Sequence, residues 1–263
     1  MADWTLAIEY DYRFGALRVT PVDPEGNPKA DFVLRVSDVL RHSPISPHEL
    51  QAYLTEAQQP MLPMEDIESI RQRAIRETDC AGMTVLDIGG YDGWAAAQTL
   101  QQGAERAICL DNHQYEHYGW KEKKYEGVEY VNGDFMEEQD WDCRGNLPGW
   151  VRKAPDIIIF YNVLYHLKNP WAALEKVRNL LAPGGEMLLC TLFRYHIGPW
   201  AYLYEPRECN PTDETVYWGL SIEALERLLK VTGWEFKQIG MALDRVVYRC
   251  KPIPGFRVKH GNF

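Results

Sequence analysis

The sequence has no run of about eighteen apolar residues, so it contains no stretch long enough to cross a bilayer as a helix. Its first residues lack the basic and apolar regions of a secretion signal. The six cysteines include no Cys-x-x-Cys pair, which disfavours a disulfide or zinc framework and indicates buried thiols. The 28 lysines and arginines are outnumbered by 38 acidic residues, which gives a formal net charge of -10. This negative charge disfavours broad nucleic-acid binding. We therefore expect a cytoplasmic protein that contacts no membrane.

Aromatic side chains, by contrast, are abundant. The 263 residues include 9 tryptophans and 15 tyrosines, which indicates a large aromatic core or an aromatic-lined pocket. The length allows an α/β domain with a small appendage. We expect residues 1–45 to form a small N-terminal β segment and residues 46–263 to form the main domain. The β segment would pack on that domain or on a second subunit of a homodimer, or else recognise substrate.

A strand, a glycine turn and a helix form the stretch around which the chain is organised. Apolar residues over 84–88 indicate a short buried strand, and residues 95–100 are good helix formers. The turn between them holds three glycines that let a ligand approach the backbone closely: Gly89, Gly90 and Gly93. Tyr91 stands where a dinucleotide-binding fingerprint has its middle glycine, which disfavours a NAD-dependent oxidoreductase.

Polar residues end the strands that follow. Asp111 comes 24 positions after Asp87, at the tip of the next strand, where an acid can accept hydrogen bonds from ribose hydroxyls. Capping the next helix explains Asp111 equally well. A third strand ends in Gly-Asp-Phe at 133–135, and the apolar run 155–160 leads into Asn-Val-Leu-Tyr-His-Leu at 162–167. Parallel strands end at one edge of a sheet, so these groups are expected to share one cleft.

From about residue 65 to 250, the sequence resembles the class I S-adenosylmethionine (SAM)-dependent methyltransferases. The resemblance rests on Asp-x-Gly-x-x-x-Gly from Asp87, on Gly-Asp-Phe, and on Leu-x-Pro-Gly-Gly at 181–185. Val-Leu-Tyr-His-Leu-x-x-Pro and Gly-Trp-Glu at 233–235 look like the branch with the tRNA wobble-uridine carboxymethyl- and methyltransferase-like proteins. That branch also has many unassigned members that are encoded with small-molecule and sugar pathways. The resemblance implies an α/β fold, with a Rossmann-like, mostly parallel seven-stranded sheet and helices on both faces.

By resemblance, SAM would bind in this cleft and leave as S-adenosylhomocysteine (SAH). Asp111 would hold the ribose, Asp134 and Phe135 the adenine, and Asn162 and Val163 would lie along the methionine end. The complete set of expected cofactor-binding residues is Asp87, Gly89, Gly90, Tyr91, Gly93, Trp94, Asp111, Asn112, Asp134, Phe135, Asn162 and Val163.

His166 is the candidate base, since it follows the fourth strand and an unperturbed imidazole titrates near neutrality. It could instead only bond the backbone and orient its loop. Tyr165, the other catalytic candidate, could stack on the cofactor or point at substrate. The expected reaction is in-line methyl transfer to a small molecule, on a hydroxyl. Modification of a tRNA base and a non-catalytic SAM-binding role are the alternatives.

A long aromatic segment over about 193–220 interrupts the pattern. Long connections inside a domain are typically functional, so we expect a lid over the substrate, although packing alone explains a share of its rings. Its expected substrate-binding residues are Arg194, Tyr195, Arg207 and Trp218, with the arginines available for an anionic group. His113 and His117, one helical turn apart, could hold a metal, but no third ligand is evident. They are expected to flank the adenosine, and no metal is expected.

Overall fold

The structure is a computed structural model that describes residues 66–112, 125–136, 153–194, 196, 198–242 and 244–256, with the backbone of three N-terminal strands. Tyr195, His113 and His117 lie outside the described residues, as does the expected boundary near residue 45. The roles given to them above therefore stay predictions.

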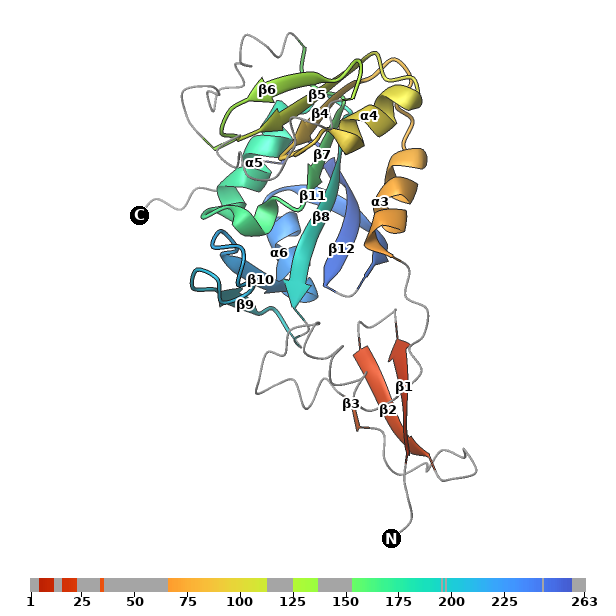
Figure 1. Cartoon of the computed structure of the whole chain (residues 1–263), viewed down its shortest axis with the longest axis vertical. Helices are drawn as coiled ribbons and strands as arrows, with labels where there is room; N and C mark the ends of the chain where they lie inside the picture. Colours follow the sequence, from red (N-terminus) through yellow and green to blue (C-terminus); the bar gives the residue numbers. More distant parts are fainter. Residues whose placement is uncertain are drawn as a thin grey trace.

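One mixed sheet forms the centre of the described chain (Figure 1). Along it the strands run in the order β11 (Trp234–Met241), β12 (Arg245–Pro252), β8 (Glu186–Arg194), β7 (Ile157–Tyr161), β4 (Thr84–Ile88), β5 (Arg106–Asp111) and β6 (Glu129–Asn132). All neighbours from β8 to β6 are parallel, whereas β12 is antiparallel to β8 and to β11. The expected Rossmann-like fold class is confirmed.

The direction of winding reverses between β4 and β7. From β4 the chain moves outward through β5 and β6, and it then returns to the other side of β4 to form β7 and β8. Every residue of β4 and β7 is buried, as expected for central parallel strands covered on both faces. In open α/β sheets, the crevice at the carboxyl ends of the strands at such a switch point is where ligands bind.

Helices cover both faces of the sheet (Figure 1). α3 (Ile67–Arg76) and α4 (Trp94–Gln101) pack on one face, and α5 (Pro170–Leu180) and α6 (Ile222–Val231) on the other. Local sequence sets their starts, because the side chains of Asp66, Asn169 and Ser221 accept backbone N–H bonds from the first turns of α3, α5 and α6.

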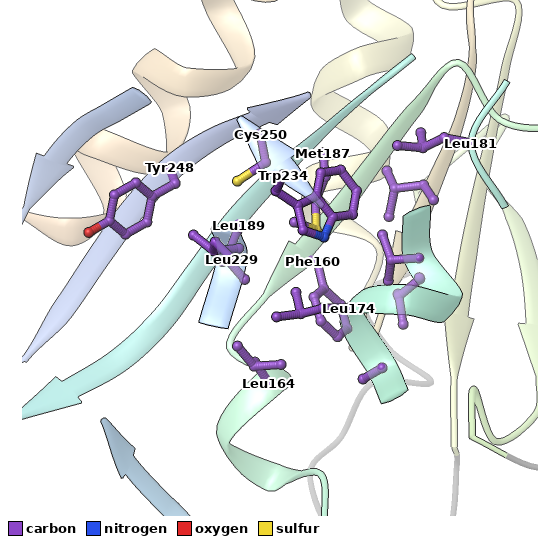
Figure 2. Packing of buried hydrophobic residues seen from close by; sticks show 14 of the residues in the cluster. Phe160, Leu164, Leu174, Leu181, Met187, Leu189, Leu229, Trp234, Tyr248 and Cys250 are labelled. Atoms are coloured by element: carbon purple, nitrogen blue, oxygen red, sulfur yellow. The ribbon is translucent and has the colours of Figure 1, made fainter. Parts of the chain in front are cut away.

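The two faces differ in the size of their core side chains. On the side of α5 and α6, Trp234 and Phe160 are fully buried, with Leu174 and Leu229 packed in the same cluster (Figure 2). On the opposite side, α4 contributes the alanines 95–97 to the core. Small side chains let α4 approach the sheet closely, which brings its first turn down onto the end of β4.

The segment after β8 is more regular than the sequence indicated. β8 continues to Arg194, and strands β9 (Ala201–Leu203) and β10 (Trp218–Ser221) then pair antiparallel with one another. β10 also pairs parallel with β8, through Leu220 and Phe193. The insert is thus tied to the edge of the sheet, and its irregular part is the connection between β9 and β10.

The N-terminal strands form a separate antiparallel sheet in the order β1 (Thr5–Asp11), β2 (Ala16–Val22) and β3 (Leu34–Arg35). In the described part of the chain, no helix has the length and apolarity needed to cross a membrane. The same residues contain no group of three His, Cys, Asp or Glu side chains that could hold a metal. Of the described cysteines, which are all free, four are buried and Cys209 is half-buried.

Two glycines flank β4 in the left-handed conformation, Gly82 with φ +68° and Gly89 with φ +66°. A Cβ at Gly82 would meet nothing within 4 Å, whereas a Cβ at Gly89 would overlap Cγ2 of Val163, which follows β7. The two positions therefore share the same backbone requirement and differ in the space available. At Gly89, unlike at Gly82, the turn after β4 packs directly against Val163 in the loop after β7.

We expect Gly82→Ala to lower the free energy of unfolding by about 1–2 kcal/mol, the cost of the left-handed conformation. Gly89→Ala should cost about 1–3 kcal/mol more, because Val163 must also move. Urea denaturation of the two variants measures the difference. Equal losses at the two positions would contradict the close contact with Val163.

Candidate active site

A cavity of ≈ 1170 Å³ opens at the carboxyl ends of β4, β5 and β7. It is larger than most small-ligand pockets, which hold about 300–1,000 Å³, and so leaves room for a second molecule beside a nucleoside-sized one. All the expected cofactor-binding residues except Gly93 line it, together with Tyr165 and His166. Gly93 instead starts α4 in the left-handed conformation, with φ +82°.

Asp87 is buried at the floor of the cavity, with 1% of its surface exposed. Its Oδ2 accepts the backbone N–H of Ala96, in the first turn of α4, at 3.3 Å. A Cβ at Gly90 would lie 2.6 Å from the same oxygen, so only glycine leaves room there. Burial raises the pKa of Asp87 to about 7, and the charges of Asp111 and Asp92 add to this, while the Ala96 N–H acts in the opposite direction.

Asp111 is held against the glycine turn by the backbone. Its Oδ2 accepts the N–H of Tyr91 at 2.8 Å. Tyr91 has φ +50°, the left-handed region that a middle glycine would adopt without strain. The turn therefore has the shape expected of a glycine-rich loop although a tyrosine occupies that position. The Tyr91 side chain is 42% exposed at the cavity rim.

Phe135 and Asp134 form the wall beyond β6. Asp134 Oδ1 accepts the N–H of Met136 at 2.7 Å, which fixes the turn after the strand. Phe135 is 5% exposed, and its ring centroid lies 5.8 Å from that of Phe160. Phe135 thus belongs both to the hydrophobic core and to the cavity wall, which gives the cavity a fixed apolar side.

Arg245, from β12, holds two residues of the segment that follows β7, Asn162 and Tyr165. Its Nε donates to Asn162 Oδ1 at 3.2 Å and its Nη2 to the hydroxyl of Tyr165 at 3.3 Å. The guanidinium also lies 5.0 Å from the centre of the Tyr165 ring. Burial raises the pKa of Tyr165, so its phenol stays neutral, and its hydroxyl is already engaged.

His166 lies in the 3₁₀ turn η4 (Leu164–His166), where its ring packs 4.2 Å from that of Tyr165. Its Nδ1 is 3.1 Å from the backbone oxygen of Thr215 and 2.9 Å from Thr215 Oγ1. Burial lowers the pKa of His166, although the charge of Asp213 and the bond to Thr215 oppose the shift. Burial thus favours the neutral imidazole, which is the form that can accept a proton.

The structure places two of the expected substrate contacts in the insert, Arg194 and Trp218, away from the cavity lining. Arg194 is 4% exposed, and its guanidinium bonds the hydroxyl of Tyr204 and, at 2.9 Å, the sulfur of Cys209. Trp218 donates its Nε1–H to the carbonyl of Leu167 at 3.0 Å. Neither lines the cavity, and both side chains hold the insert in place instead. Arg207 does line the cavity.

Sequence reasoning missed Arg71, which lines the cavity from α3. Its guanidinium lies 5.6 Å from the centre of the Trp94 ring and 5.8 Å from that of Tyr161, and it pairs with Glu68. Its Nε is buried and has no hydrogen-bond partner among the described residues. Nothing in the sequence separates this arginine from the others in the same helix, because the choice depends on how α3 is rotated against the sheet. The partners of His166 at 213 and 215 were missed for a similar reason.

We expect Asp87→Asn to change how stability depends on pH. The folded protein holds the Asp87 proton more tightly than the unfolded chain, since the pKa rises from 3.8 to about 7. The contribution of Asp87 to the free energy of unfolding is therefore full below about pH 4 and is lost as the pH rises towards about 7. Asparagine keeps the acceptor for Ala96 and does not titrate. Urea denaturation of both proteins without cofactor should show the variant gaining on the wild type between pH 5 and pH 8, and a constant difference would contradict the shifted pKa.

Comparison with known proteins agrees with this geometry. A family described as a methyltransferase domain matches residues 46–239. The tRNA U34 carboxymethyltransferase of Chromohalobacter salexigens is 28% identical over 160 residues, which cover 59% of this chain and 45% of that protein. That of Klebsiella pneumoniae is 30% identical over 121 residues, 44% of this chain and 33% of that protein. The chain thus spans a third to a half of the length of these curated relatives.

Solved structures show the same fold at lower identity. The 1,6-didemethyltoxoflavin-N1-methyltransferase of Burkholderia thailandensis, with 1,6-didemethyltoxoflavin and SAH bound, has a TM-score of 0.51 at 15% identity, covering 95% of this chain and 99% of that one. Because the family match covers most of the sequence and the sheet order agrees with it, the chain belongs to the methyltransferase-domain family and has the fold of the class I SAM-dependent methyltransferases.

Proposed function

We propose that the protein transfers a methyl group from SAM to the hydroxyl of a small molecule, with His166 as the general base. The observation that supports this most directly is the imidazole of His166, held at Nδ1 by Thr215 in the wall of the cavity that also contains Asp87 and Asp111. The cavity volume leaves room for an acceptor between the glycine turn and the insert. The proposed reaction uses acceptors small enough to fit in this space.

The residues at the glycine turn fit SAM in charge and in shape. Gly89 and Gly90 let the turn pack closely against Val163 and Asp87, and Asp111 presents a carboxylate suited to ribose hydroxyls. The unpartnered Nε of Arg71 suits the carboxylate of the methionine end. Asp87 suits the cationic amino group, because a positive charge beside a buried carboxyl stabilises its ionised form.

The methyl group of SAM is already activated, so the protein itself has few chemical steps to perform. SAM supplies a methyl group on a sulfonium, which a nucleophile displaces in line. The chain has to align the acceptor, exclude water and take up a proton. Nε2 of His166 accepts the hydroxyl proton while an electron pair of that oxygen forms the new C–O bond and the C–S pair returns to sulfur. The imidazolium then releases its proton to water.

We further propose that the insert acts as a lid that contacts the acceptor. Arg207 and residues 212–215 line the cavity from the connection between β9 and β10. Arg207 pairs with Glu214 at 3.3 Å, and both side chains are about two-thirds exposed. An exposed pair of this kind contributes little stability, so an anionic group on the acceptor can replace Glu214. The N-terminal strands stay a separate proposal as a homodimer contact.

A second candidate function is the modification of a tRNA base, which the curated tRNA U34 relatives favour. Lys168 and Arg207 line the cavity and could contact a phosphate. The formal net charge of -10 works against extended contact with tRNA, because such binding depends on neutralising many phosphates. A small acceptor therefore agrees better with the charge of the whole chain.

Arg71→Ala should weaken SAH binding about 10-fold or more, because a charge-assisted hydrogen bond to the carboxylate is lost. Arg76→Ala is the matched control, since Arg76 is exposed on the same helix and does not line the cavity. Isothermal titration with SAH measures both variants. An unchanged affinity for Arg71→Ala would remove the carboxylate contact from the proposal.

His166→Ala should lower turnover by about 100-fold or more, because the hydroxyl proton has no acceptor, while SAH affinity stays nearly the same. The measurement is SAH release with a panel of hydroxyl-bearing small molecules and with unmodified tRNA. Turnover on tRNA alone would favour the second candidate. Equal turnover of wild type and variant on a small molecule would end the catalytic role of His166.

A further inference from the structure

The hydrogen bonds around Thr215 determine which nitrogen of His166 carries the proton. Thr215 Oγ1 donates to Asp213 Oδ1 at 2.6 Å, so its hydrogen is not available to the imidazole. The backbone oxygen of Thr215 can only accept. Both oxygens near Nδ1 are therefore acceptors, and the proton of the neutral ring must lie on Nδ1. Nε2 then carries the lone pair, which is the form a general base needs.

We propose that Asp213 and Thr215 are positioning residues that set the tautomer and the basicity of His166. The inference rests on the proposed function only where it concerns catalysis, because the tautomer is a property of the free protein. Asp213 is itself fixed, since its Oδ1 also accepts the N–H of Thr215 at 2.9 Å. Two residues of the insert thus complete the hydrogen-bond environment of His166, the proposed general base in the main domain.

The connection that carries Asp213 and Thr215 is attached on both sides of His166. The N–H of Tyr217 donates to the carbonyl of Tyr165 at 2.9 Å, and Nε1 of Trp218 donates to that of Leu167 at 3.0 Å. These bonds align the insert with the η4 turn residue by residue. The orientation of the imidazole therefore depends on the position of the insert, and a displaced insert leaves His166 without its Nδ1 partners.

Charge adds a second effect to orientation. Asp213 Oδ2 lies 3.9 Å from Nδ1 and favours the imidazolium that forms when Nε2 takes a proton. Burial and the positive charge of Arg245 act in the opposite direction, and Tyr165, packed against the ring, is neutral. Removing the charge of Asp213 should therefore lower the affinity of Nε2 for a proton and leave the tautomer unchanged.

The experiment is ¹⁵N NMR of protein labelled in the histidine rings, titrated over pH, with His166 identified by the signals lost in His166→Gln. The wild type should show Nδ1 protonated and Nε2 as the unprotonated nitrogen at neutral pH. Asp213→Asn keeps the acceptor oxygen and removes the charge, so the tautomer should persist and the titration should move to lower pH. Thr215→Val keeps the backbone acceptor and removes Oγ1, so the Nδ1 tautomer should persist while the His166 signals and titration shift, and Thr215→Ser should restore the wild-type signals.

Glu208→Gln is the matched control, because it changes a carboxylate to an amide in the same insert, away from the cavity lining. It should leave the His166 signals unchanged. Asp213→Asn should lower the turnover rate about 10-fold, and the acid limb of the pH profile of turnover should shift to lower pH. His166 signals and titration that are identical in wild type, Asp213→Asn and Thr215→Val would overturn the inference. If the His166 signals change in the Asp213 and Thr215 variants while turnover does not, the positioning role is supported and His166 is refuted as the base.

Discussion

The close approach of Gly89 to Val163 is the contact on which the geometry of the site depends. It joins the turns after β4 and β7, the two strands at the switch point of the sheet. The Gly89 N–H also donates to the carbonyl of Leu110 in β5 at 2.8 Å, and the carbonyl of Val163 accepts the N–H of His166 at 2.9 Å. The turn after Asp87 and the loop that carries His166 are therefore packed directly against one another.

Burial favours the neutral forms of two titratable side chains in the cavity lining, Asp87 and His166. It raises the pKa of Asp87 and lowers that of His166, and in each case it is the largest cause of the shift. A carboxyl and an imidazole with opposite shifts in one site are typical of acid–base assignments in enzymes. Burial thus acts against charge on both side chains before anything binds.

In the insert, the position of a residue decides what it contacts more than its side-chain type does. Arg194 and Trp218 have the chemistry of substrate ligands, yet both face the body of the protein and hold the insert to β8 and to the carbonyl of Leu167. Asp213 and Thr215 are chemically ordinary loop residues, yet they reach the imidazole. The pairing of β10 with β8 decides this, because it sets which part of the connection lies above the cavity.

The sequence alone determined the order of strands and helices, the glycine turn and the polar residues at the strand tips, since these follow from local periodicity and from spacing along the chain. It thereby placed Asp87, Asp111, Asn162 and His166 in one cleft before any contact was known. Only the tertiary structure decided that Arg71 faces the cavity, that Arg245 holds Asn162 and Tyr165, and that Thr215 reaches Nδ1 of His166. Those contacts join segments 40 or more positions apart or depend on the rotation of a helix, and no local pattern encodes either quantity.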